Sequence, residues 1–307
     1  MNRRDFLSSM LWSAAGGISA GMLSDEISSQ SLLGAGPSWI EIDGHPAGWA
    51  TVRGGDTVIW HLPADRGPRG MLPPPSTPLK HTSNLELQFA CGMSTNFYRW
   101  IGTCLQISQP APATVEAVRF HAHDVVQRRT WAGAYVTHLV IPDLDPDNQE
   151  PVRLQAVVHL TQSSDQHPAK EASPLRQNQC TWSKSGFRFR IPGLERLSER
   201  VQGITALECT RPLATNVLDA SRRNSVHAGA PVFSPLGLRL PHQEQERLIH
   251  ELETRNDSCR GILTLTSGGN PWLELELMGL RAGSEKPTVA EPNLMCSFAS
   301  ARLSLPV

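Results

Sequence analysis

Four histidines lie on segments that the sequence pattern predicts to be strands, and their imidazole rings could bind a metal ion. His121 and His123 are two positions apart, so both rings would lie on the same face of a strand. His138 and His159 fall on neighbouring predicted strands and could approach that face as further ligands. No carboxylate or third ligand stands at a spacing that completes a known metal site. We therefore interpret all four as sheet histidines that form hydrogen bonds across the face, and predict no metal and no cofactor.

A second set of polar residues could coordinate calcium through oxygen atoms. Carboxylate and amide oxygens follow one predicted strand closely: Asp143, Asp145, Asp147, Asn148 and Glu150. This order resembles the opening of a calcium-binding loop. However, Pro146 interrupts it, and the sixth position lacks the glycine that an EF-hand turn requires. We interpret the segment as a loop between strands.

Two glutamates could form the carboxylate pair of a glycosidase. Glu274 and Glu276 alternate with leucines on one predicted strand, so both would lie on one face of a sheet, as solvent-exposed sheet residues also do. The chain has no G-x-S-x-G elbow, no Gly-Lys-Ser phosphate loop and no dinucleotide-binding glycine pattern. We predict no enzyme and no catalytic residues. A hydrolase whose triad comes from distant residues is the alternative.

The cysteines offer neither a metal site nor an obvious pairing. Six are dispersed along the chain: Cys91, Cys104, Cys180, Cys209, Cys259 and Cys296. They form no C-x-x-C pair and have no histidine at a spacing that would complete a zinc site. We predict small apolar thiols within the core, with disulfides as the alternative if the protein is exported.

Composition excludes some partners and suggests two domains. The chain has 307 residues, a formal net charge of -1 and only 19% charged residues. Nothing in this balance predicts binding to nucleic acid or to an anionic membrane by charge. The 24 prolines and 24 glycines are scattered, which is typical of many turns between short strands.

The first residues resemble a twin-arginine export signal. Arg3 and Arg4 precede Phe6-Leu7, and an uncharged stretch rich in Ala, Gly and Ser continues to residue 23. That stretch is too short and too rich in glycine for a stable membrane span. We predict a leader at 1–23, a polar linker at 24–37 and export to the periplasm or beyond. The alternatives are an irregular amino terminus with a chance Arg-Arg pair and a cytoplasmic protein or a virion-like particle.

In the first half, alternating and β-branched runs predict a mostly β unit at 38–165 with one helix. The predicted strands are 39–44, 49–60, 85–89, 115–120, 130–141 and 152–160, with a proline-rich surface loop at 63–78. Ser94 or Thr95 would cap a helix whose apolar stripe includes Phe97 and Trp100.

The second half, 186–307, repeats this order of elements. The predicted strands are 187–191, 201–209, 236–240, 262–265, 272–280 and 298–305, and Gly268-Gly269-Asn270 predicts a hairpin turn. Pro241 starts a helix that Asn256 and Asp257 end. We interpret the chain as two tandem β-barrel or β-sandwich units, each with a flanking helix, that arose by duplication. Two unrelated β domains are the alternative.

Several short motifs follow one another in the first half. They are Ile42-Asp43-Gly44, Ala47-Gly48, Gly54-Gly55-Asp56, Lys80-His81, Gly92-Met93-Ser94 leading into Phe97-Tyr98-Arg99-Trp100-Ile101, Trp131-Ala132-Gly133-Ala134-Tyr135, and Ile141-Pro142-Asp143-Leu144-Asp145-Pro146. In this order they resemble the tail-tube family of contractile phages and of related bacterial injection systems. The resemblance covers about 38–160, with a fainter echo from Gly203-Ile204-Thr205 onward.

The resemblance implies a structural subunit that associates with itself through strand pairing, forming rings that stack into a tube. Other tail or injection-system components would be its further partners. Two units in one chain imply that three chains form a ring with pseudo-sixfold symmetry. The leader departs from the family, because phage tubes assemble in the cytoplasm. The alternative function is an exported β-sandwich binding module, for example for carbohydrate, with Trp49 or Trp60 as a stacking platform.

Overall fold

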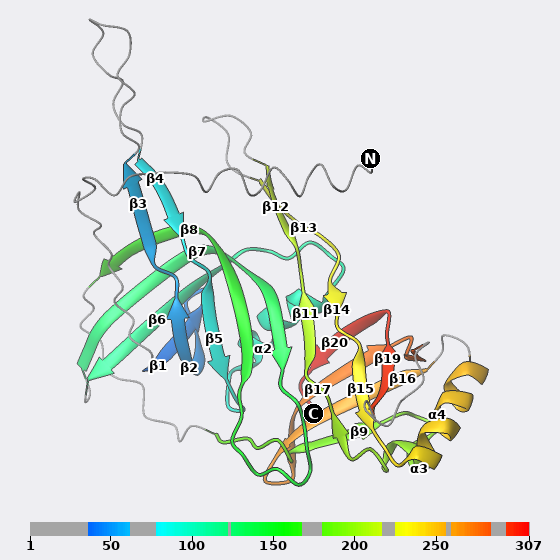
Figure 1. Ribbon diagram of the computed structural model, residues 1–307. Helices are drawn as coiled ribbons and strands as arrows, with labels where there is room; N and C mark the ends of the chain where they lie inside the picture. The colour runs from blue at the N-terminus through cyan, green and yellow to red at the C-terminus, as the bar shows by residue number, and fades with distance from the viewer. Residues whose placement is uncertain are drawn as a thin grey trace, which may run out of the picture.

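The fold is mostly antiparallel β, with a closed six-stranded barrel and further antiparallel sheets, which confirms the predicted fold class. The computed structural model of the protein (Figure 1) describes residues 36–61, 78–121, 124–167, 180–216, 225–255, 259–283 and 293–306. The predicted leader and most of the predicted linker lie outside these residues. Gly36 and Pro37, placed in the linker by the sequence analysis, instead begin the first strand.

The first half of the chain forms the closed barrel. Its strands are β1 (Gly36–Ile42), β2 (His45–Gly54), β5 (Leu85–Phe89), β6 (Ala113–His121), β7 (Asp124–Ile141) and β8 (Leu154–His167). They pair in the order β7-β6-β1-β2-β5-β8, and β8 pairs back onto β7. Alternation determines which side chains face inward: Leu85, Leu87 and Phe89 are buried, whereas the residues between them are partly exposed. The apolar sets of the six strands therefore form one core.

A tight turn joins β1 to β2 and connects them to β6. Asp43 and Gly44 have φ values of 51° and 75°, which a two-residue hairpin turn with matching twist requires. The Asp43 carboxylate accepts a hydrogen bond from the Thr114 backbone N–H at 2.7 Å. The Asp43 N–H donates to the Thr114 carbonyl oxygen at 2.9 Å. These two hydrogen bonds hold the turn against the start of β6.

The predicted first helix is confirmed as α2 (Thr95–Gly102), followed by a 3-10 turn, η1 (Thr103–Leu105). The Ser94 hydroxyl accepts a hydrogen bond from the Phe97 N–H at 3.3 Å and so caps the helix. Figure 1 shows α2 between the barrel and the sheet of the second half. It is therefore covered on two sides, and Phe97, Trp100 and Ile101 are buried.

The second half contains two four-stranded sheets. Their orders are β20-β17-β16-β9 and β10-β15-β19-β18. The strands are β9 (Phe187–Arg190), β10 (Gly203–Ile204), β15 (Leu236–Arg239), β16 (Arg260–Ser267), β17 (Asn270–Met278), β18 (Arg281–Ala282), β19 (Asn293–Ser297) and β20 (Ser300–Ser304). The second predicted helix is α4 (His242–Thr254), and a one-turn helix that was not predicted, α3 (Glu195–Ser198), lies between β9 and β10.

The strand pairings of the second half correspond to those of the barrel. Strands β9, β10, β15 and β16 take the places of β1, β2, β5 and β6. The pair β17 and β18 takes the place of β7, and the pair β19 and β20 takes the place of β8. One pairing differs: β1 pairs with β2, whereas β9 pairs among the described residues with β16 alone. The segment that contains α3 separates β9 from β10, so this second barrel is open along one seam.

The two halves also carry insertions at corresponding places. Between β2 and β5, β3 (Thr57–His61) and β4 (Pro78–Thr82) form a hairpin. Between β10 and β15, β11 (Leu207–Thr210) pairs with β14 (Val232–Phe233), and β12 (Leu213–Asn216) with β13 (Ser225–Ala228). Figure 1 shows both hairpins extending from the same end of the molecule. The order of elements that the two halves share therefore includes a hairpin inserted at the same place in each half.

Candidate assembly interface

The two halves are joined by a strand of the second half that adds to the barrel. The first part of β7 pairs with β6, and its last four residues pair with β11 in antiparallel register, from Leu207 opposite Ile141 to Thr210 opposite His138. Strand β11 thereby covers backbone groups of β7 that would otherwise form an open edge. The contact is edge-to-edge strand addition between two units of corresponding topology.

A buried arginine directly after β11 forms hydrogen bonds with the first half. Arg211 is 1% exposed, and its guanidinium donates to the carbonyl oxygens of Thr103, Gln106 and Ser108 at 2.6, 2.7 and 2.6 Å. These carbonyls lie at the end of α2 and just after η1, where the negative end of the helix dipole favours a cation. One side chain of the second half thus satisfies three acceptors of the first half. Sequence reasoning missed this residue, because an arginine before a proline gives no signal of burial.

Two thiols meet beside this arginine. The Cys104 and Cys209 sulfur atoms lie 3.9 Å apart, and the Cys209 thiol also faces the Cys104 carbonyl oxygen at 3.7 Å. The hydrogen bond between the thiols and burial both raise the pKa of Cys104. Cys104 is therefore a neutral thiol at neutral pH, and the pair packs as the sequence analysis predicted for core cysteines.

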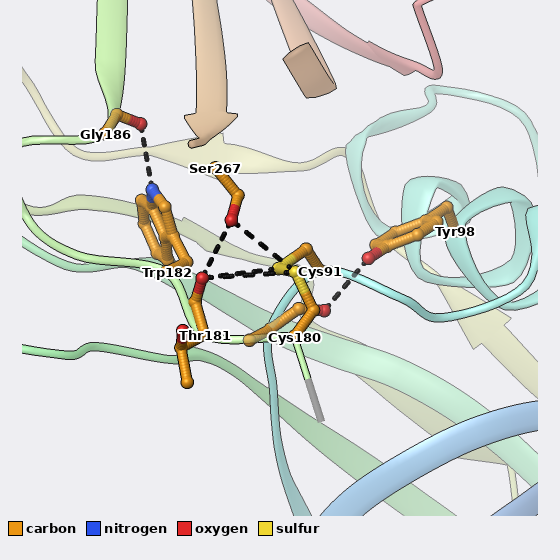
Figure 2. Close-up of a disulfide and its surroundings, with 8 residues drawn as sticks. Cys91, Tyr98, Cys180, Thr181, Trp182, Gly186 and Ser267 are labelled. Carbon is orange, nitrogen blue, oxygen red and sulfur yellow. Dashed lines mark hydrogen bonds between the residues drawn. A yellow bond between two sulfur atoms is a disulfide. The ribbon is translucent and has the colours of Figure 1, made fainter. Parts of the chain in front are cut away.

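Aromatic rings fill the rest of the contact. Tyr98 of α2 lies with its ring centre 6.0 Å from that of Trp272 on β17, and Trp272 lies 5.5 Å from Trp182. The Tyr98 hydroxyl donates to the Ala90 carbonyl oxygen at 3.0 Å, and the Trp182 ring N–H donates to the Gly186 carbonyl oxygen at 2.8 Å (Figure 2). The polar ends of both rings are thus satisfied while their apolar faces pack between the halves.

A disulfide between Cys91 and Cys180 crosses the same contact (Figure 2). For these two residues the prediction of free core thiols is wrong, because the fold brings together cysteines 89 positions apart. Ser267 of β16 donates to the Thr181 carbonyl oxygen at 2.8 Å beside the disulfide, which fixes the segment that precedes β9. The remaining cysteines are buried free thiols, as predicted: Cys104, Cys209, Cys259 and Cys296.

Alkylation should distinguish the two classes of cysteine. Burial raises the pKa of Cys296 to about 12 and also raises that of Cys259, so we expect no reaction of these thiols with iodoacetamide in the native protein at pH 8. Without reductant, denaturation should expose four reactive thiols, and with reductant six. Intact mass measurement counts the adducts. Six adducts without reductant would show that the disulfide does not form.

The loop after β7 contains the oxygen donors considered for calcium. Basic side chains occupy them: Lys184 lies 3.2 Å from Asp143 and 3.5 Å from Glu150, and Arg239 lies 3.0 Å from Asp145. The adjacent Leu144 exchanges two backbone hydrogen bonds with Ile204 of β10, at 2.8 and 2.9 Å. The loop therefore reaches the open seam of the second half, where Asp145 pairs with Arg239 of β15, and its other carboxylates pair with Lys184 of the segment before β9.

The ion pair between Asp145 and Arg239 should make stability depend on pH. The hydrogen bond from Arg239, followed by that from the Asp147 backbone N–H, lowers the pKa of Asp145. A carboxyl whose pKa is lowered on folding stabilises the protein above its unfolded pKa of about 3.9, and this contribution is lost as the pH falls through the folded value. Asp145→Asn should thus lower the melting temperature at pH 7. The difference from wild type should shrink as the pH falls below about 3.9, and a difference independent of pH would contradict this origin.

Of the four histidines that were considered as metal ligands and interpreted as sheet residues, His138 and His159 have side chains within the described residues. No group of three or more His, Cys, Asp or Glu side chains that could hold a metal is found there. His138 lies 3.4 Å from the Glu208 carboxylate, and His159 lies 3.3 Å from the Asn84 side-chain oxygen. His159 therefore forms a hydrogen bond with Asn84, and the His138 ring faces a carboxylate of β11 without forming a hydrogen bond to it. The side chains of His121 and His123 lie outside the described residues.

The two glutamates considered as a glycosidase pair and the tryptophans considered as stacking platforms can also be located in the structure. Glu276 forms an ion pair with Arg260 at 2.7 Å, and Glu274 borders a groove beside β9. Trp49 packs edge-on against Trp39 and Phe120, with ring centres 5.7 and 5.9 Å away, so it is not an open stacking platform. The side chain of Trp60 lies outside the described residues.

Comparisons with known proteins add no relative. In the described part of the chain, no helix has the length and apolar character needed to cross a membrane. A scan against models of protein families found no match, and a search of curated proteins found no similar sequence. The interface between the two halves is therefore the structural basis for inferring a function.

Proposed function

We propose that the protein is a structural subunit that assembles with itself into rings or a tube, as the family that its first half resembles does. The observation that supports this most is the internal interface, in which two units of corresponding topology associate by strand addition from β11 to β7. Such a contact can repeat between chains, because each chain ends in units of the same kind. No catalytic role is part of this proposal.

The internal contact is heterologous, which favours a ring over a two-fold dimer. The first half contributes α2 and the end of β7, whereas the second half contributes β11 and β20. Each half therefore uses a different surface, and the complementary surfaces remain at the two ends of the chain. Repeating a head-to-tail contact gives a ring if the rotation closes and a filament if it does not. Three chains would supply the six units of a pseudo-sixfold ring.

The assembly can be tested by measuring the mass of the protein in solution. We expect native mass spectrometry and sedimentation to show a complex that forms with rising concentration, with a trimer as the closed unit. Negative-stain micrographs should show rings or stacked rings. A protein that stays strictly monomeric at high concentration would contradict the proposed function.

Export is part of the same proposal, and the disulfide supports it. Disulfides persist in oxidising compartments and are rare in the bacterial cytoplasm, so the Cys91–Cys180 bond agrees with the twin-arginine pattern at Arg3 and Arg4. Replacing both arginines by lysine should retain the protein in the cytoplasm. Unchanged fractionation of this variant would favour a cytoplasmic protein.

A binding module is the second candidate, because a groove follows the unpaired side of β9. Phe187, Arg188 and Glu274 line it, and an aromatic ring beside charged groups is a combination that sugar rings bind. Titration with a panel of oligosaccharides, followed by tryptophan fluorescence, tests this function. A saturable change in a protein that remains monomeric would favour the binding module over the assembly subunit.

A further inference from the structure

The two helices of the chain correspond residue by residue. Buried positions of α2 and η1 recur in α4 at one constant offset along the sequence: Phe97 and Gln245, Trp100 and Leu248, Ile101 and Ile249, Cys104 and Leu252. Seven of these side chains are buried, and Ile249 is partly buried against the core. Both helices therefore turn the same face toward their own unit. Their remaining faces can be compared directly.

The face of α2 that contacts the second half has a counterpart on α4. Tyr98 packs near Trp272, and a Cβ atom on Gly102 would lie 3.6 Å from the Leu303 side chain of β20. Leu105 borders a small apolar cavity together with Leu275 and Ala301 of the second half. At the same offset, these three positions become Glu246, His250 and Glu253.

The three positions on α2 and the three corresponding positions on α4 differ in burial. Tyr98 and Leu105 are 3% exposed because the second half covers them, whereas Glu246, His250 and Glu253 are all exposed. Figure 1 shows α4 on the side of the second half that lies away from the barrel. Within the described part of the chain, α4 therefore presents to solvent the face that α2 uses for its contact.

We propose that Glu246, His250 and Glu253 form the surface by which one chain contacts the first half of a second copy. This proposal rests on the proposed assembly, because it continues the established internal interface by one further unit. In the first half, the strand that corresponds to β20 is the last part of β8. Helix α4 of one chain would therefore lie against the last part of β8 in the barrel of the next chain, as α2 lies against β20 within one chain. The occupant is thus a second copy of this chain.

The chemistry of this surface differs from that of the internal contact. Tyr98, Gly102 and Leu105 form an apolar contact within one folded chain, whereas the α4 face carries two carboxylates and an imidazole. Contacts between charged, exposed groups are screened by salt and mainly affect association rates and partner choice. The contact between chains should therefore be reversible and sensitive to salt, and the free chain remains without an exposed apolar face at α4.

A matched control lies on the same helix. Arg247 corresponds to Arg99 of α2, and Arg99 is exposed although α2 is in contact with the second half. Arg247 should therefore remain exposed when α4 contacts the next chain. Arg247→Glu also reverses a charge on α4, beside Glu246, but it changes a residue outside the proposed surface.

The test compares Glu246→Arg/Glu253→Arg with Arg247→Glu by sedimentation velocity over a range of concentrations. We expect the double variant to raise the concentration for half-maximal assembly about tenfold or more, while Arg247→Glu assembles as wild type does. Circular dichroism should show the same fold for all three proteins. Amide exchange in α4 of the wild-type protein, which needs no substitution, should slow on assembly.

The outcomes separate this inference from the function on which it rests. Wild type that assembles together with a double variant that assembles equally well would overturn the α4 surface and leave the proposed function intact. Equal loss in the double variant and in Arg247→Glu would also overturn it, since the effect would then not be confined to this face. Wild type that never assembles would overturn both.

Discussion

Replacing Arg211 by methionine should lower the free energy of unfolding by about 3 kcal/mol, because the buried guanidinium donates to three partly buried carbonyl oxygens and each lost hydrogen bond costs about 1 kcal/mol. Methionine fills a similar volume, so the loss arises from hydrogen bonding rather than from a large cavity. The guanidinium is also held where the carbonyl ends of α2 and η1 accumulate negative charge. The effect should therefore exceed that of an ordinary surface arginine by several-fold.

Urea unfolding, followed by tryptophan fluorescence, measures this change. Arg200→Met is the control, because Arg200 is exposed after α3 and its loss should change stability by no more than about 0.5 kcal/mol. Arg211→Lys should recover only part of the stability, since an ammonium group cannot copy the planar fork that reaches three acceptors. A value for Arg211→Met within the range of the control would show that the three hydrogen bonds contribute little.

Local patterns in the sequence predicted much of the fold. Period-two alternation located strands such as Leu85–Phe89, because a half-buried strand must place successive side chains on opposite faces. Ser94 and the spacing of Phe97 and Trp100 located α2 and its cap. Gly268 and Gly269, with φ values of 57° and 84°, form the predicted turn between β16 and β17. Each of these features depends on residues close in sequence.

Features that depend on tertiary approach could not be predicted in this way. Cys91 and Cys180 pair because the fold brings distant segments together, and Arg211 is buried because the carbonyls that it needs belong to the other half. Lys184 and Arg239 occupy the carboxylates of a loop that resembles a calcium site when it is considered alone. Short strands such as β18 were missed because two residues give no periodicity.

Removing the Cys91–Cys180 disulfide should destabilise the protein by about 4 to 5 kcal/mol in the chain-entropy treatment of a loop of this length. The bond closes a loop across 89 positions and joins the end of β5 to the segment before β9. In the unfolded chain, the link closes a loop that contains most of the first half, and this restriction is lost when both cysteines become serine. The double variant Cys91→Ser/Cys180→Ser avoids leaving an unpaired thiol at either position.

Reductant provides the control for this prediction. Dithiothreitol should lower the unfolding free energy of wild type to that of Cys91→Ser/Cys180→Ser, and it should leave the variant unchanged, because the other four cysteines are already thiols. Urea unfolding with and without reductant gives all four values. An equal effect of reductant on both proteins, or a variant as stable as oxidised wild type, would contradict the role of this bond. Because the bond lies at the same contact as Tyr98 and Trp182, its loss should also loosen the packing between the barrel and the second half.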